Sequence, residues 1–145
     1  MKKLELEPIK ENILKTLQEN IFDRNKELGY FLDLLNAIDG SYSVALDGRW
    51  GSGKTFFVKQ MQLAIETMNP SIQMEEGQRG IIKNVLSNVV KKERLQPQYP
   101  IYYDAWEHDS DADPILSLIY SITEAYDYFN VLGVQDKKNG INCWP

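Results

Sequence analysis

One eight-residue segment combines residue types and a spacing that predict chemistry. Residues 48–55 read Gly-Arg-Trp-Gly-Ser-Gly-Lys-Thr and fit the pattern G-x-x-x-x-G-K-[ST] of a phosphate-binding loop. Glycines let the backbone turn with positive φ and approach an anion without a Cβ in the way. Successive N–H groups can then point at phosphate oxygens, and the following helix adds the positive end of its dipole. From average residue frequencies, a chance match in such a chain is on the order of one in a few hundred.

Two side chains of this loop carry specific tasks in the predicted site. Lys54 is expected to bridge the β- and γ-phosphates of a nucleotide, and the Thr55 hydroxyl is expected to ligate Mg²⁺. The expected nucleotide-binding residues are Gly48, Arg49, Trp50, Gly51, Ser52, Gly53, Lys54 and Thr55.

A phosphate-binding loop needs a strand before it and a helix after it. The continuous apolar residues 44–46 predict a short buried strand over 41–48, and helical spacing follows from 53 to 68. A second strand is predicted over 100–106, between an amphipathic helix at 81–95 and a last helix at 114–129. This order predicts an α/β fold with parallel strands flanked by helices.

The remaining segments complete this layout. Helices are predicted over 8–17 and 21–38, so that residues 1–40 form a helical lead-in. Residues 71–80 are predicted to be a loop. Asp113 is expected to cap the last helix, with Pro114 at its first position. The polar residues 130–145 show no period and predict an irregular tail.

Two separate motifs, in the right order, resemble the KAP family of P-loop NTPases. The first is the loop with Trp50, which is similar to the family's G-x-W-G-S-G-K-[ST]; the second is Asp104-Ala105-Trp106 at the end of the second predicted strand. The resemblance covers roughly residues 20–128. It implies a P-loop NTPase core that binds ATP and Mg²⁺ and, in the intact domain, hydrolyses ATP. It also implies protein or membrane-associated partners, in signalling assemblies or in bacterial exclusion of phages and plasmids.

Two features of the KAP pattern have no match in this sequence. Family members carry a Walker B strand, an apolar run ending in paired acids near an arginine, and many have transmembrane segments between the Walker motifs. No segment after Trp106 matches the first, and no apolar run approaches the roughly 20 residues that span a bilayer. We therefore expect residues 1–145 to be one partial P-loop NTPase domain, truncated before Walker B.

Asp104 is the candidate for the missing acid. It follows the apolar run 101–103, as a metal-holding aspartate does at a strand end, although an exposed strand-end acid would look the same. No other catalytic residue is predicted.

The alternating acids after Trp106 raise the question of calcium. An EF-hand loop needs a glycine at its sixth position and a glutamate at its twelfth, and counting from Asp109 those positions hold Pro114 and Tyr120. A solvated loop that leads into a helix cap is the better interpretation. His108 has no evident partner in the sequence and is expected at the surface.

Three further side chains invite a role beside the loop. Trp106 ends an apolar strand and is expected to be buried there, whereas Trp50 is predicted either to pack or to stack on a base. A loose analogy with related P-loop domains places Arg24 near the adenine or the phosphates.

Composition limits the class of protein. The 145 residues carry a formal charge of −5 with a pI near 4.9, which argues against nucleic-acid binding. The single cysteine, Cys143, excludes an internal disulfide framework. The charged start of the chain is no secretory signal, so a cytoplasmic location is expected.

Nucleotide binding, with ATP preferred, is the function that the sequence predicts. A small P-loop kinase and a non-catalytic nucleotide-binding interaction module are the alternatives. The kinase would need a catalytic acid and a lid with arginines, and arginine is absent after residue 94. Base specificity, partner, oligomeric state and catalytic competence stay open.

Overall fold

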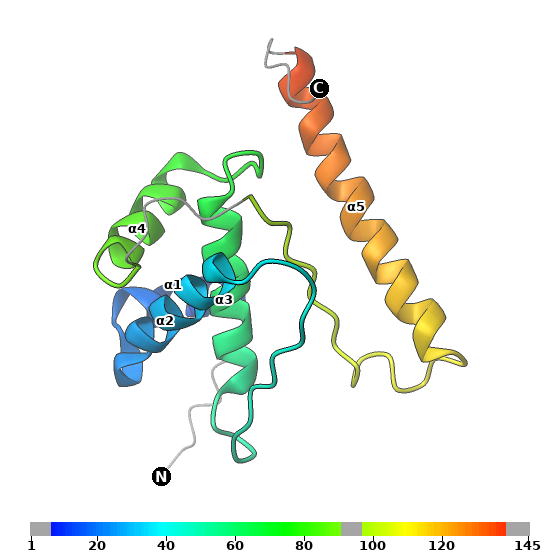
Figure 1. Ribbon diagram of the computed structural model, residues 1–145, viewed down its shortest axis with the longest axis horizontal. Coiled ribbons are helices and arrows are strands. Elements are labelled where there is room, and N and C mark those ends of the chain that lie inside the picture. The colour runs from blue at the N-terminus through cyan, green and yellow to red at the C-terminus, as the bar shows by residue number, and fades with distance from the viewer. Residues whose placement is uncertain (1–6, 91–96, 139–145) are drawn as a thin grey trace.

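Four helices pack against one another, and a long fifth helix stands apart from them (Figure 1). The computed structural model describes residues 7–90 and 97–138, and side chains within those ranges except at 76 and 129–138. The elements in chain order are α1 (Lys10–Gln18), the short 3-10 turn η1 (Ile21–Asp23), α2 (Arg24–Ala37), α3 (Lys54–Met68), α4 (Glu76–Ser87) and α5 (Pro114–Lys138).

The hydrophobic core lies between α1, α2, α3 and α4, and each of these helices contributes to it. Apolar side chains recur at three- and four-residue steps on one face of each helix, and burying these faces together removes them from water. α3 lies in contact with the other three helices. The buried apolar residues of this core are Ile13, Leu17, Leu28, Leu32, Phe57, Leu63, Ala64, Ile82 and Leu86.

Polar groups buried beside this core are hydrogen-bonded across elements. The Asn25 amide at the start of α2 donates to the Leu17 carbonyl at 2.7 Å, which ties α2 to α1. The Gln60 amide of α3 donates to the Thr16 hydroxyl of α1 at 3.0 Å. Such bonds offset the cost of burying polar atoms and fix the relative register of the helices.

A buried arginine closes the turn between α3 and α4. The Arg79 guanidinium donates to the carbonyls of Thr67 at 2.6 Å, Asn69 at 3.3 Å and Ile72. Its planar fork of donors suits several acceptors at once, so one side chain satisfies carbonyls that the end of α3 leaves without helical partners. The Asn69 amide also donates to the Gln98 carbonyl at 2.8 Å and anchors the later extended segment.

The predicted parallel sheet is wrong for the residues that the structure describes. Neither range, 7–90 or 97–138, contains a strand, and both predicted strand segments are irregular. Val44, Leu46 and Ile101 keep 49%, 45% and 43% of their surface exposed, so these apolar runs are not buried either. The physical reason is that a strand makes its hydrogen bonds to a neighbour, and neither segment lies in a ladder with another.

The helix predictions are confirmed for the N-terminal part, with shifted boundaries later in the chain. α1, α2 and α3 lie where apolar spacing predicts helices. α4 begins at Glu76 inside the predicted loop 71–80 and ends at Ser87. Residues 91–95 of the helix predicted over 81–95 lie outside the described residues. α5 continues to Lys138, past the predicted end near 129, so residues 130–138 of the expected irregular tail are helical. Cys143 lies outside the described residues.

Candidate functional site

The glycine-rich loop connects the extended segment 41–47 to the first turn of α3. Gly51 and Gly53 have φ of 74° and 81°, backbone conformations that cost other residues free energy. The N–H of Ser52 donates to the Arg49 carbonyl at 3.1 Å, which closes a tight turn within the loop. α3 begins at Lys54, directly after Gly53, and no side chain caps its first N–H groups. The loop thus delivers the chain to the positive end of a four-turn helix.

Lys54 folds back over the start of this loop. Its Nζ donates to the carbonyl oxygens of Gly48 at 2.6 Å and Arg49 at 3.0 Å. The ammonium group is therefore held at the mouth of the loop by exchangeable contacts rather than by a carboxylate. A bound phosphate offers a stronger partner, because its negative charge adds a Coulomb attraction to the ammonium that a neutral carbonyl lacks.

The other residues of the motif differ in how much of their surface is exposed and in how closely they pack. Thr55 is exposed in the first turn of α3, and Arg49 is exposed at the loop. A Cβ added at Gly48 would lie 3.0 Å from the Ser52 hydroxyl, so the loop closes tightly on itself at this glycine. Of the expected residues, 48–53 form the loop, and Lys54 and Thr55 stand in the first turn of α3.

Arg24, at the start of α2, reaches this loop from a distant part of the sequence. Its Nη1 donates to the Gly53 carbonyl at 3.0 Å, and its Nη2 donates to the Ser52 carbonyl. The sequence suggested only a loose proximity to phosphates or adenine. The contact that the structure shows is with two carbonyl groups of the loop backbone.

A cavity of about 620 Å³ opens between α2 and the loop. Its wall on the α2 side combines the charged Arg24 and Glu27, near the start of the helix, with aromatic and aliphatic side chains farther along it. Such a mixture accepts a flat, partly polar ring. The sequence analysis did not predict this wall. The apolar residues of α2 that lie outside its core-facing side are the feature that could have indicated it. The lining residues are Arg24, Glu27, Tyr30, Phe31, Leu34, Leu46, Asp47, Gly48, Ser52, Lys54 and Phe57.

Asp104 lies in a turn that its own carboxylate stabilises. Oδ1 accepts from the Trp106 N–H at 3.0 Å, and Oδ2 accepts from the Tyr102 hydroxyl at 3.1 Å. The hydrogen bond from the Trp106 backbone is the largest cause that lowers the Asp104 pKa, and the nearby Lys59 ammonium adds to it. The carboxylate therefore stays ionised at neutral pH. Its hydrogen-bond donors in the structure are protein groups of the same turn.

The tryptophans of the two motifs meet at the loop tip. The Trp50 and Trp106 rings form an edge-to-face pair with centroids 6.1 Å apart and an interplanar angle of 89°. Trp50 is 90% exposed and Trp106 is 77% exposed, so the expected burial of Trp106 is wrong. The reason follows from the missing sheet, because the apolar strand whose core Trp106 was to join is itself solvent-exposed. The pair instead joins the D-A-W turn to the phosphate-binding loop.

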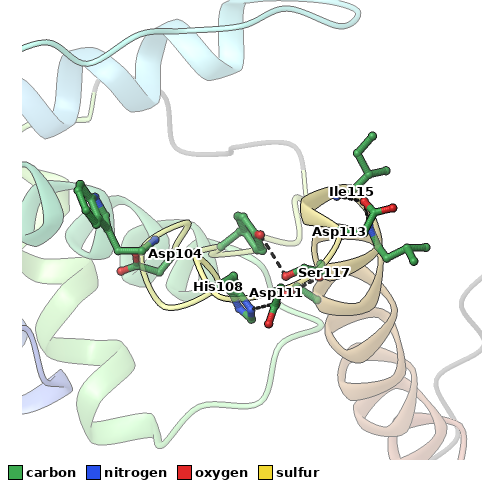
Figure 2. A network of polar contacts seen from close by, with 10 residues as sticks. Asp104, His108, Asp111, Asp113, Ile115 and Ser117 are labelled. Atoms are coloured by element: carbon green, nitrogen blue, oxygen red, sulfur yellow. Dashed lines mark hydrogen bonds and ion pairs between the residues drawn. The ribbon is translucent and has the colours of Figure 1, made fainter.

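A small polar network links that turn to α5 (Figure 2). His108 Nδ1 lies 2.8 Å from Asp111 Oδ2, which gives this histidine a partner that the sequence did not reveal. The Tyr103 ring stacks on His108 at 4.9 Å, and its hydroxyl lies 3.1 Å from the Ser117 hydroxyl. These contacts hold the acidic loop against the start of α5.

Asp113 caps α5 as its sequence predicts. Its Oδ1 accepts from the N–H groups of Ile115 at 2.9 Å and Leu116 at 3.3 Å, next to Pro114 in the first helical position (Figure 2). Within the described ranges, no three His, Cys, Asp or Glu side chains gather closely enough to hold a metal ion. Of the acids in 107–113, Asp111 pairs with His108 and Asp113 caps α5.

No helix in the described part of the chain is long and apolar enough to cross a membrane.

Comparison with known proteins supplies one match. The family model for the KAP family P-loop domain matches residues 8–127, which includes α1 through α4, the glycine-rich loop, the D-A-W turn and the described side chains at the start of α5. No curated protein and no solved structure gives a significant match.

Proposed function

Because this chain belongs to the KAP family of P-loop domains, we propose that its nucleotide is ATP, bound with Mg²⁺ at residues 48–55. Nucleotide binding is the general property of a P-loop domain. The observation that carries the proposal is the loop backbone, in which Gly51 and Gly53 adopt positive φ directly before the uncapped N-terminus of α3. This arrangement leaves backbone N–H groups for phosphate oxygens.

The side chains of the loop fit the triphosphate in our proposal. Lys54 would transfer its donors from the Gly48 and Arg49 carbonyls to phosphate oxygens, because the anionic acceptors are stronger. The exposed Thr55 hydroxyl, in the first turn of α3, is an oxygen ligand of the kind that Mg²⁺ prefers. When bound, Mg²⁺ supplies positive charge that neutralises the phosphates.

The apolar wall of the cavity gives the proposal room for the nucleoside. Tyr30, Phe31 and Leu34 line one side of it, and the loop residues line the other. A base tethered to a phosphate chain on residues 48–55 would reach this wall. Leu46 and Phe57 extend the apolar lining toward α3.

We propose that ATP turnover by this chain is slow. In-line attack on the γ-phosphate requires a group that orients the attacking water, besides the phosphate loop and the metal site. Asp104 stays a candidate for the metal acid, but both of its oxygens already serve the D-A-W turn. We expect turnover below roughly 1 s⁻¹, an ordinary enzyme rate. A faster rate that Lys54→Ala abolishes would contradict this and would make Asp104→Asn the next variant.

Calorimetric titration with Mg²⁺-ATP tests the binding site. Lys54→Ala should weaken the affinity at least tenfold, about 1.4 kcal/mol, with little change in melting temperature, since Lys54 is not part of the hydrophobic core. Lys83→Ala, which removes the same charge from an exposed position of α4, is the matched control and should bind like the parent. Equal affinity of the Lys54→Ala variant and the parent would refute the assignment. Titration with Mg²⁺-GTP compares the two purines.

A further inference from the structure

The guanidinium of Arg24 contacts two successive carbonyl groups of the phosphate-binding loop. Nη1 donates to the Gly53 oxygen at 3.0 Å and Nη2 to the Ser52 oxygen, so two nitrogens of one planar group each hold one peptide unit. The Gly53 oxygen also accepts the N–H of Phe57 at 3.0 Å, the first hydrogen bond of α3. Both acceptor sites of this carbonyl are therefore used, one by Arg24 and one by the first hydrogen bond of α3.

The planarity of the peptide bond converts these two contacts into an orientation of two donors. In a trans peptide the C=O and the N–H of the next residue point in opposite directions. Fixing the Ser52 carbonyl toward Arg24 directs the Gly53 N–H away from it. Fixing the Gly53 carbonyl directs the Lys54 N–H away in the same manner. These are two of the N–H groups that a loop of this pattern offers to phosphate.

We propose that Arg24 is a positioning residue for nucleotide binding, which acts by holding the carbonyls of Ser52 and Gly53 so that the N–H groups behind them face the phosphates. The proposal rests on the nucleotide-binding function proposed above. It assigns to α2 a part in the phosphate site that the motif 48–55 alone does not contain.

The chain before Arg24 is shaped to hold this side chain in place. Asn20, Phe22 and Asp23 all have positive φ, which is unfavourable for residues with a Cβ and is maintained only where the surroundings determine it. The Asn20 side chain bonds to Asp23 Oδ1 at 2.9 Å and to the Asn25 N–H at 3.1 Å, which fixes the turn around Arg24. These hydrogen bonds fix the backbone at the start of α2, from which the Arg24 side chain extends.

Glycine at position 53 suits this arrangement. Its φ of 81° disfavours any side chain, and a Cβ at this position would lie 2.8 Å from Arg24 Nη1. The absence of a side chain at Gly53 therefore leaves room for phosphate and for the Arg24 guanidinium. A close contact of this kind is expected of a guanidinium that holds the loop backbone.

Arg24 also lines the cavity beside the loop, so a direct contact with the nucleotide is the competing role. The two roles predict different results for lysine at this position. A lysine keeps the positive charge but lacks the planar pair of donors that holds two carbonyls at once. A direct charge contact survives Arg24→Lys, whereas the clamp does not.

The test measures the affinity of the full chain for Mg²⁺-ATP and for Mg²⁺ with inorganic triphosphate, by calorimetry. We expect Arg24→Ala and Arg24→Lys each to weaken both ligands about tenfold, because the defect lies in the phosphate cradle rather than in the base site. Lys83→Ala removes the same charge from an exposed position of α4, away from the cavity, and should bind both ligands like the parent. In nitrogen-15 spectra without nucleotide, the Gly53 and Lys54 amide resonances should shift in both Arg24 variants and stay unchanged in Lys83→Ala.

Each result has a defined meaning. Restoration of parent affinity by Arg24→Lys would overturn the clamp in favour of a charge contact. Parent-like triphosphate binding by Arg24→Ala, with unmoved Gly53 and Lys54 resonances, would overturn any positioning role while leaving the proposed function intact. A parent chain that binds neither ligand would refute the proposed function itself, and the clamp with it. Melting temperatures of the variants separate these results from loss of fold.

Discussion

The helices α1–α4 and the two extended segments, 41–47 and 97–104, are made of similar apolar residues, yet only the helices form a core. Leu28 and Leu32 on α2 are fully buried, whereas Val44 and Leu46, a few residues later, stay about half exposed. The two regions differ in where their backbone hydrogen bonds are made. A helix satisfies its own N–H and C=O groups within one segment, while a strand needs a neighbour.

This difference explains which segments can bury their apolar side chains without a partner strand. Four short helices each need only an apolar face to pack on, and each finds one among the other three. The extended segments would have to pair with a strand before their apolar side chains could be covered, and the described residues provide none. The phosphate-binding loop joins the two regions, because the unpaired segment 41–47 precedes it in the sequence and α3 follows it.

α5 differs from both regions, because it is a regular helix whose described apolar side chains, such as Ile115, Leu116 and Ile119, are exposed rather than packed in the core. The interior N–H and C=O groups of a helix bond to one another without help from a neighbouring segment. The local signals of α5, Asp113 as cap and Pro114 after it, suffice to start it. In this chain a segment can therefore form a helix without burying its apolar side chains.

The largest change in stability is expected in the hydrophobic core. Leu32→Ala removes a fully buried side chain from α2 and should lower the free energy of unfolding by about 2–5 kcal/mol. Leu46→Ala, the same change in the extended segment, should cost less than about 1 kcal/mol because half of that side chain is already in water. Urea unfolding of both variants measures the contrast. Equal losses would show that segment 41–47 is part of the core.

The next effect concerns the buried arginine between α3 and α4. Arg79→Ala leaves the carbonyls of Thr67, Asn69 and Ile72 without their donor and should destabilise the fold by about 1–3 kcal/mol. Arg49→Ala removes an equal charge from an exposed loop position and serves as the control, with an expected change within about 0.5 kcal/mol. Differential scanning calorimetry gives both values. An unchanged melting temperature for Arg79→Ala would contradict the role of this side chain.

A smaller effect is expected at the exposed tryptophan pair. Trp106→Ala should change stability by less than about 1 kcal/mol, because Trp106 is 77% exposed and loses mainly its contact with Trp50. This is far below the 3–5 kcal/mol that removing a buried tryptophan costs. The melting temperature decides the matter. A loss in the larger range would mean that the ring is buried in solution and that the extended segment has found a partner.

The smallest effect is a pH dependence within the helical region. Burial is the largest cause that raises the pKa of Glu66 above its ordinary 4.5, and the amide of Gln62 at 2.9 Å opposes the shift. The folded chain therefore holds this proton more tightly than the unfolded chain. Stability is greatest below pH 4.5 as far as Glu66 is concerned, and it falls as the pH rises through the folded pKa.

Replacing the titrating group isolates this contribution. Glu66→Gln keeps the acceptor for Gln62 and removes the charge, so it should raise the melting temperature slightly at pH 7 and leave it unchanged near pH 4. Glu19→Gln, at an exposed position of similar charge, controls for net charge. A lower melting temperature of Glu66→Gln at pH 7 would show that the carboxylate is favourably paired instead.

Much of the helical region could be predicted from the sequence, because its signals are local. Apolar spacing indicates α1, α2 and α3, and the pair Asp113-Pro114 marks the start of α5. The phosphate-binding loop is likewise a contiguous motif whose glycines and lysine can be recognised without a fold.

The rest depends on contacts that no local pattern encodes. The strand predictions assumed that a partner strand would cover residues 44–46, and the expected burial of Trp106 depended on the same assumption. Arg24 meets Gly53 across an interval of 29 positions, and the side chain alone does not reveal which carbonyls it will hold. The Tyr30 wall of the cavity follows only once α2 is placed beside the loop.

Hydrogen–deuterium exchange with and without Mg²⁺-ATP reads the backbone N–H groups that we assign to phosphate binding. We expect residues 49–55 to gain protection when the nucleotide is added, and this gain to disappear in Lys54→Ala. The extended segment 97–104 should change little by comparison. Protection that appears elsewhere while residues 49–55 exchange as before would contradict the assignment of the phosphate site to this loop.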